Sequence, residues 1–144
     1  MRLYMDSSAF AKRYIQEPGT ARVRALLELA DELLLSVLTL PEVAGALNRL
    51  RREGRLTDAG YSGCKQRLLA DLEGASVVAI TPAILSGAVR CLERVSLRAA
   101  DAVHVAAALE ANPDQFVSAD HRQCKAARAM GLVVVDVSSE AEGG

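Results

Sequence analysis

Five short, mostly apolar segments separated by stretches of helical periodicity constrain the fold of this 144-residue chain most strongly. Runs of this length without regular polar alternation are typical of strands that are buried on both faces of a parallel sheet. The segments are residues 2–5, 33–37, 77–80, 115–118 and 132–135. Short buried strands that alternate with helices predict a single α/β domain in which helices flank a parallel sheet.

Cap and turn residues delimit the helices that we expect between these strands. Thr39, with Glu42 three residues later, has the pattern of a capping box. Thr20 is expected to cap the second helix, and Ser7 or Ser8 the first. The predicted helices cover residues 8–15, 20–30, 39–54, 57–74, 82–95, 97–111 and 121–130.

Two aspartates lie at the carboxyl ends of predicted strands. Asp6 ends the first strand, and Asp120 lies two residues beyond the fourth, after Ser118. The carboxyl ends of parallel strands meet at one edge of a sheet, where open α/β sheets bind their ligands. An ordinary surface loop explains either aspartate alone, but together they indicate a site at this edge.

Asp101 lies on the apolar face of its predicted helix, together with Leu97, Val105 and Ala108. Burying a carboxylate there is unfavourable unless the carboxylate is paired or binds a cation. The helix dipole favours an acid near a helix start, but it does not explain why this acid is on the apolar face. Glu42, after the second strand, has an alternative structural role in the capping box.

Four acids at one sheet edge cannot all ionise without compensation, so either some stay protonated or divalent cations bind them. Carboxylate oxygens are hard ligands that suit Mg²⁺ or Mn²⁺. Two such ions can align a water and a leaving oxygen for phosphodiester cleavage. The acids therefore favour metal-dependent hydrolysis of a phosphodiester.

Four motifs, taken in order, make the chain resemble PIN-domain proteins of the VapC-type toxin group. The resemblance extends over residues 2–136, and the small residues before the last strand also fit it. The motifs are Asp6 to Ala9, Glu42 after the second strand, Ala100 to Ala107 around Asp101, and Phe116 to Asp120.

The resemblance implies a PIN-like three-layer sandwich with a central, mostly parallel five-stranded sheet flanked by helices. Residues 1–137 would form this single domain, and residues 138–144 a flexible acidic tail. The implied activity is that of a metal-dependent endoribonuclease, the toxin component of a type II toxin–antitoxin system that hydrolyses RNA phosphodiester bonds. Family toxins are usually paired with a small cognate antitoxin protein and often form homodimers.

The resemblance also implies the site residues and the cofactor. Mg²⁺ or Mn²⁺ would be bound by Asp6, Glu42, Asp101 and Asp120, and Ser118, which matches a Ser or Thr of the family, would complete the catalytic set. Many relatives carry a further acid just after the fourth, where this chain continues with His121, Arg122 and Gln123. The resemblance therefore leaves the number of metal ions, one or two, open.

Other polar residues near these motifs have simpler interpretations. His104 and His121 share no ligand spacing, and we interpret His104 as a hydrogen-bonded helix histidine and His121 as a surface residue beside the site. A group of basic residues flanks the helix of Glu42 and forms either a solvated face or a phosphate-binding surface. The group consists of Arg49, Arg51, Arg52, Arg55, Lys65 and Arg67, with Lys12 and Arg13 as similar candidates.

Two other classes of function were compared with this pattern. A phospho-receiver domain needs an acid pair after the first strand, an aspartate after the third and a lysine after the fifth. Ser7, Thr81 and Asp136 occupy those places, which excludes a receiver. A non-catalytic PIN-like RNA- or protein-binding module is the remaining alternative, and metal-dependent cleavage of RNA distinguishes it from the toxin.

Composition limits partners and compartment. The net charge of −1 gives no global attraction to nucleic acid, so any RNA-binding surface must be local. Three widely spaced cysteines without a CxxC pattern favour a reduced, cytoplasmic chain. We expect no membrane association, because there is no signal-peptide pattern and no apolar run near the ~20 residues that a span needs.

Overall fold

A five-stranded sheet forms the centre of the computed structural model, which describes residues 1–141. The strands are β1 (Arg2–Met5), β2 (Glu32–Ser36), β3 (Ser76–Val78), β4 (Gln115–Ser118) and β5 (Val134–Asp136). They lie in the order β3-β2-β1-β4-β5, and every neighbouring pair is parallel. The predicted parallel α/β sheet is confirmed, and β1 lies at its centre.

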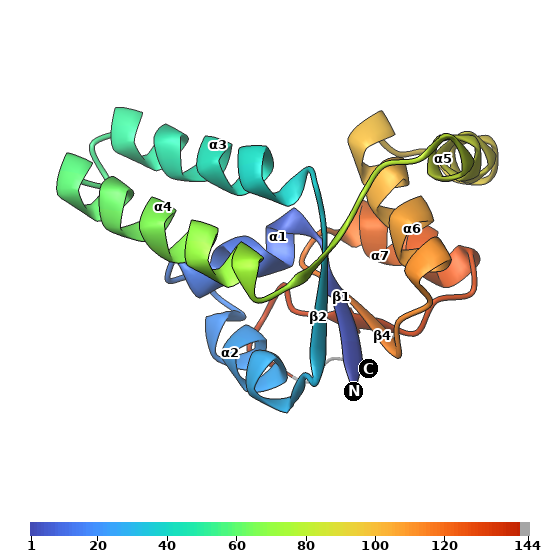
Figure 1. Ribbon diagram of the computed structural model, residues 1–144, viewed down its shortest axis with the longest axis horizontal. Helices are drawn as coiled ribbons and strands as arrows, with labels where there is room; N and C mark the ends of the chain where they lie inside the picture. Colours follow the sequence, from blue (N-terminus) through green and yellow to red (C-terminus); the bar gives the residue numbers. More distant parts are fainter. Residues whose placement is uncertain (142–144) are drawn as a thin grey trace.

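Helices cover both faces of the sheet (Figure 1). One face is covered by α1 (Ser7–Phe10), the 3₁₀ turn η1 (Ala11–Arg13), α2 (Thr20–Leu29), α3 (Thr39–Arg52) and α4 (Asp58–Glu73), and the other by α5 (Pro82–Arg94), α6 (Ala99–Ala111) and α7 (His121–Ala129). The three-layer arrangement is therefore confirmed. Within the described residues, no helix is both long and apolar enough to cross a membrane.

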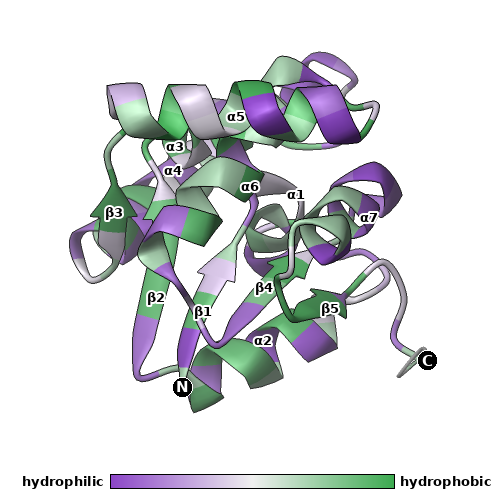
Figure 2. Ribbon diagram, turned by 90° about the vertical axis from the view of Figure 1, so that its right-hand side faces the viewer, coloured by the Kyte–Doolittle hydropathy of each residue, from purple (hydrophilic) through white to green (hydrophobic). Residues whose placement is uncertain are grey.

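The core consists of two apolar clusters, one on each face of the sheet. Tyr4 and Phe116 face α5, α6 and α7, whereas Leu3, Met5 and Val117 face the other helical layer. This alternation explains why the strands read as continuous apolar runs, since both of their faces are covered. Apolar and polar residues alternate around α5, as in a helix with one face on the core (Figure 2).

The first two helices do not use the caps that the sequence predicts. Asp6, and not one of the serines after it, caps α1 by accepting a hydrogen bond from the Ala9 N–H at 2.9 Å. Gly19 precedes α2 in a left-handed conformation with φ of 95°. The hydroxyl of Thr20 instead accepts from the N–H of Glu17 at 3.1 Å, within the turn before the helix.

The predicted capping box of α3 is wrong. Leu38 is the N-cap residue and makes no side-chain cap bond. Thr39 is buried, and its hydroxyl has no hydrogen-bond partner in the described structure. Glu42 is therefore not used as a cap, which leaves its carboxylate available at the sheet edge.

The last strand begins two residues later, and ends one residue later, than the apolar run of residues 132–135 suggests. It covers Val134–Asp136, because these residues pair in register with Phe116, Val117 and Ser118 of β4. Asp136 thus ends β5 beside Ser118. β3 covers Ser76–Val78 instead of the predicted residues 77–80, and Val78 lies opposite Ser36, the last residue of β2.

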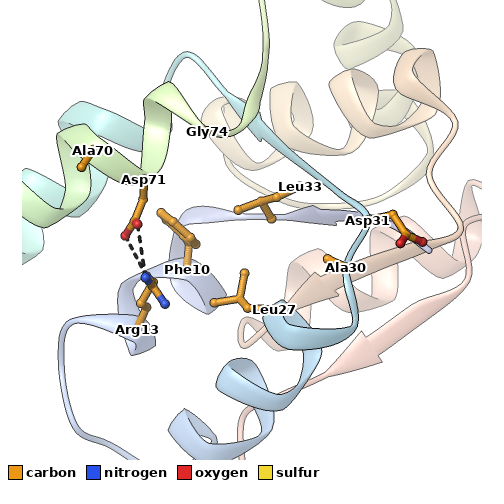
Figure 3. A pocket seen from close by; sticks show the side chains of 9 residues that line it. All are labelled: Phe10, Arg13, Leu27, Ala30, Asp31, Leu33, Ala70, Asp71 and Gly74. Atoms are coloured by element: carbon orange, nitrogen blue, oxygen red, sulfur yellow. Dashed lines mark hydrogen bonds and ion pairs between the residues drawn. The ribbon is translucent and has the colours of Figure 1, made fainter.

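A cavity of about 340 Å³ lies between the end of α2, the end of α4 and the segment formed by α1 and η1 (Figure 3). Phe10, Leu27 and Leu33 contribute its apolar wall. Arg13 donates to both carboxylate oxygens of Asp71, at 2.7 and 3.2 Å. This ion pair joins η1 to α4, and none of the four predicted site acids lines the cavity.

The segment after β5 contacts α2. The carboxylate of Glu140 accepts from the N–H of Gly19 at 2.8 Å, and Arg22 donates to the carbonyl oxygens of Asp136 and Ser139 at 2.6 and 3.3 Å. The division into a domain of residues 1–137 and a flexible tail stays a prediction, and residues 142–144 lie outside the described residues.

Candidate active site

Asp6 is fully buried at the carboxyl end of the central strand. Its Oδ1 accepts hydrogen bonds from the Ala9 N–H at 2.9 Å and the Ser8 hydroxyl at 2.7 Å, and its Oδ2 accepts from the Ser118 hydroxyl at 2.5 Å. Burial raises the pKa of Asp6 above its ordinary value, although the three hydrogen bonds oppose the shift. Asp6 is thus held firmly by three donors, while its burial disfavours the ionised form.

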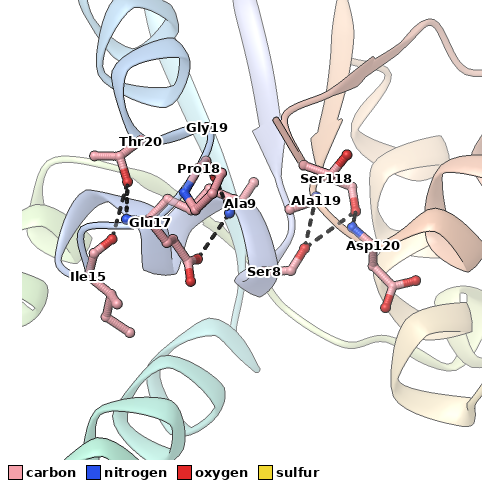
Figure 4. Close-up of polar contacts among 12 residues, drawn as sticks. Ser8, Ala9, Ile15, Glu17, Pro18, Gly19, Thr20, Ser118, Ala119 and Asp120 are labelled. Atoms are coloured by element: carbon pink, nitrogen blue, oxygen red, sulfur yellow. Dashed lines mark hydrogen bonds and ion pairs between the residues drawn. The ribbon is translucent and has the colours of Figure 1, made fainter. Parts of the chain in front are cut away.

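Ser8 and Ser118 join the start of α1 to the loop after β4 (Figure 4). The Ser8 hydroxyl accepts from the N–H of Ala119 at 3.0 Å, and the Ser118 hydroxyl accepts from the N–H of Asp120 at 3.0 Å. The same two hydroxyls donate to Asp6. This network fixes the Asp120 backbone relative to Asp6, which gives Ser118 a role in orienting both acids.

Glu42, in the first turn of α3, is oriented by two side chains from other elements. Its Oε1 accepts from the Ser7 hydroxyl at 2.7 Å and lies 2.6 Å from Nε2 of His104. His104 is buried, and its Nδ1 lies 2.9 Å from the Tyr4 hydroxyl. Burial alone would raise the pKa of Glu42, but the hydrogen bonds from His104 and Ser7 outweigh it and hold that pKa below its usual value.

Asp101 and Asp120 share one neighbour, Gln123 of α7. The Gln123 side-chain amide donates to Oδ1 of Asp101 at 2.9 Å, and its backbone N–H donates to Oδ1 of Asp120 at 2.9 Å. Burial, and after it the charge of Asp120, raises the pKa of Asp101. The two acids are therefore close enough to destabilise each other's charge.

A cleft of about 680 Å³ opens beside these acids, between α3 and the loops at the carboxyl edge of the sheet. Ser7, Ser8, Glu42 and Asp120 line it directly. Asp6 lies beneath it, fully buried. Four cations also line the cleft, namely Lys12, Arg49, Arg55 and Arg98.

The four cations of the cleft differ in whether they already pair with groups of the protein. Lys12 is buried and is bound by Glu17 and the carbonyl oxygen of Pro18, and Arg55 pairs with Glu53 at 3.6 Å. Arg49 and Arg98 make no ion pair within residues 1–141. They are the cations of the cleft that are available to an anionic ligand.

Comparison with known proteins identifies the family. The family model described as "PIN domain" matches residues 3–129. The chain belongs to the PIN-domain family. It is 32% identical over 134 residues to ribonuclease VapC45 of Mycobacterium tuberculosis, a match that covers 92% of this chain and 93% of that protein.

Solved structures share the PIN fold. The crystal structure of Mycobacterium tuberculosis VapC20, described as a sarcin-ricin loop cleaving toxin, has a TM-score of 0.69 and 17% identity, and covers 98% of this chain and 99% of that one. A chain of a toxin–antitoxin complex from Klebsiella pneumoniae has a TM-score of 0.68 and 15% identity, with 95% and 98% covered.

The acids of this PIN domain offer oxygen ligands of the kind that Mg²⁺ and Mn²⁺ prefer. Oε2 of Glu42 and Oδ2 of both Asp101 and Asp120 have no hydrogen-bond partner within residues 1–141. In the same residues no three His, Cys, Asp or Glu side chains form a ready-made metal site. This arrangement fits a cation that keeps several waters and takes few carboxylates, as Mg²⁺ commonly does.

Two residues that orient the acids were not predicted as site residues from the sequence. His104 was interpreted only as a hydrogen-bonded helix histidine, yet it orients Glu42. Gln123 could not be predicted as a site residue, because glutamine is common in the first turn of a helix. His121 is exposed, as expected, and its Nδ1 lies 3.7 Å from Asp136. Of the basic residues flanking Glu42, Arg49 and Arg55 line the cleft.

Proposed function

We propose that this chain is a metal-dependent endoribonuclease and the toxin component of a type II toxin–antitoxin system. The observation that carries the proposal is the set of three acids that each direct one oxygen to hydrogen-bond donors and leave the other oxygen uncommitted. Glu42 and Asp120 line a cleft with two arginines that make no ion pair within residues 1–141, and Gln123 joins Asp101 to Asp120. The similarity to VapC-type ribonucleases over nearly the whole chain supports the same function.

Each residue of the site has a separate role in the proposed cleavage of RNA. Asp6, Glu42, Asp101 and Asp120 would hold Mg²⁺ or Mn²⁺, which when bound supplies an activated water and neutralises charge on the phosphate. Ser118 keeps Asp6 and the Asp120 loop in place. An RNA strand brings its own negative charge toward four acids, so cations must hold its phosphates nearby. Arg49 and Arg98, which line the same cleft as Glu42 and Asp120, take that role.

The partners follow from the same assignment. The solved relatives include toxin–antitoxin complexes, and we propose that a small cognate antitoxin binds this chain and that two copies form a homodimer. Expression of the chain alone should then slow growth of a bacterial host, and co-expression of the antitoxin should restore it. Undiminished growth with a folded, catalytically active protein would contradict the toxin assignment.

Cleavage of RNA by the purified protein tests the activity. We expect fragments from a mixed RNA substrate with Mg²⁺ or Mn²⁺ and none with EDTA. Asp120→Asn should abolish the fragments, since it removes one charge while its side-chain oxygen can still cap α7. Equal cleavage with EDTA would refute metal dependence. No cleavage with either metal by a folded protein would favour the alternative, a non-catalytic RNA- or protein-binding module.

A further inference from the structure

Gln123 occupies the third position of α7 and is almost completely buried, with 3% of its surface exposed. Its backbone N–H donates to Asp120, the N-cap residue of the helix. Its side-chain amide crosses to another helix and donates to Asp101. One residue thus contacts two of the four acids, which are 19 positions apart on different helices.

The direction of the Gln123 side chain is unusual for its position. A glutamine three residues after an N-cap commonly bends back to the N–H of the cap residue. Here the hydroxyl of Ser118 accepts from the N–H of Asp120 at 3.0 Å, so that N–H is already paired. The amide of Gln123 is free to point away from its own helix, toward Asp101 of α6.

The amide of Gln123 does not satisfy its own hydrogen-bonding needs. Its Oε1 is buried and has no partner in the described structure. Leaving a buried acceptor unpaired is unfavourable, and buried side-chain oxygens are normally paired. An apolar side chain would fill the same space without this loss. The polar residue therefore contributes something that packing does not, namely the hydrogen bond from its amide nitrogen to Asp101.

We propose that Gln123 is a positioning residue that holds the carboxylates of Asp101 and Asp120 together for the divalent cation. It binds one oxygen of each acid and leaves the other oxygen of each without a partner. Two neighbouring carboxylates repel each other when both are ionised, and the two donors of Gln123, one to each acid, restrain them. This inference rests on the proposed function, because it assigns a role within the same metal site.

Gln123→Met tests this role, because methionine is unbranched and of similar size but cannot donate a hydrogen bond. The matched control is Gln115→Met. Gln115 also has a buried amide oxygen without a partner, but it lies at the start of β4, at the opposite end of that strand from Ser118. The Kd for Mn²⁺ is measured by calorimetry for the parent and both variants, and melting curves in EDTA show that each is folded.

We expect Gln123→Met to weaken Mn²⁺ binding about 10-fold or more, as loss of a group that orients a metal ligand commonly does. Gln115→Met should bind Mn²⁺ as the parent does. Gln123→Asn keeps the amide but is one methylene too short to reach Asp101, so it should weaken Mn²⁺ binding as well. This variant replaces Gln123→Met in the test if the methionine variant does not fold.

Two results overturn the inference while leaving the proposed function intact. One is an unchanged Kd for Mn²⁺ in folded Gln123→Met, and the other is equal weakening in Gln115→Met. Failure of the parent to bind Mn²⁺ at all would instead refute the metal site itself, and with it this role of Gln123. RNA cleavage by the parent with Mn²⁺ separates that case from a merely weak binding signal.

Discussion

Asp6 differs from the other acids at the scale of single residues, because both of its oxygens are hydrogen-bonded and its side chain is fully buried. Its carboxylate caps the start of α1 and holds Ser8 and Ser118 together, in addition to its proposed role in binding the metal ion. Glu42 shows the opposite balance, since the hydrogen bonds from His104 and Ser7 favour its ionised form. The two acids should therefore respond oppositely to pH.

Asp6→Asn should reduce RNA cleavage at least about 100-fold while improving the relative stability of the metal-free protein at neutral pH. Burial raises the pKa of Asp6 above 3.8, so its folded form gains stability below about pH 4 and loses it as the pH rises through the raised pKa.

Melting temperatures in EDTA between pH 4 and pH 7 check this expectation. The melting temperature of Asp6→Asn minus that of the parent should increase steadily with pH, because asparagine does not titrate. A difference that stays constant across this range would show that the buried carboxylate does not carry the assumed penalty.

The sequence could indicate these acids but not their partners. Asp6 and Asp120 follow strands, and Asp101 lies on an apolar face, so each is visible in a pattern of neighbours along the chain. His104 and Tyr4 are 100 residues apart, and so are invisible as a pair until β1 and α6 pack together. Gln123 likewise acquires its contact with Asp101 only through the packing of α7 against α6.

Helix α3 carries both an acid of the proposed metal site and an arginine that we propose contacts RNA. Glu42 lies in its first turn, and Arg49 lies two turns later on the wall of the same cleft. Arg51, by contrast, donates to Asn48 and lies 4.3 Å over the ring of Tyr61, so it serves the packing of α3 against α4. One basic helix thus has a side on the cleft, which we propose contacts RNA, and a side that packs against α4.

Arg49→Ala should raise the KM for RNA several-fold with a smaller change in kcat, because Arg49 is proposed to contact phosphate and not the reacting atoms. The dependence of RNA affinity on salt should weaken by roughly one phosphate contact. Arg24→Ala is the matched control, since Arg24 is exposed on α2 and lies outside the cleft. Equal effects of the two substitutions would contradict a specific role for Arg49.

At the element scale the sequence predicts strands and helices well, but it predicts the caps of α1, α2 and α3 poorly. The order of the elements follows from apolar periodicity, which tertiary packing reinforces. The capping box of Thr39 and Glu42 fails because Glu42 finds stronger donors in Ser7 and His104, which belong to other elements. Local patterns cannot anticipate such competition from distant residues.

The whole molecule brings the acids together through its topology. With β1 at the centre of a parallel sheet, Asp6 lies between the ends of β2 and β4, and the segments that follow those strands carry Glu42 and Asp120. Asp101 reaches the same edge from α6. The sheet edge therefore carries four carboxylates, and the charges of Asp101 and Asp120 disfavour each other in the metal-free fold.

The response of the melting temperature to Mn²⁺ in the parent and in Asp101→Asn tests most directly whether these acids form a cation site. Mn²⁺ binds the folded site and not the unfolded chain, so it should raise the melting temperature of the parent. Asp101→Asn should lose most of that rise and its RNA cleavage, and in EDTA it should melt at or above the temperature of the parent because repulsion from Asp120 is relieved. A rise with Mn²⁺ as large in Asp101→Asn as in the parent would contradict the account, since Asp101 would then not be a ligand.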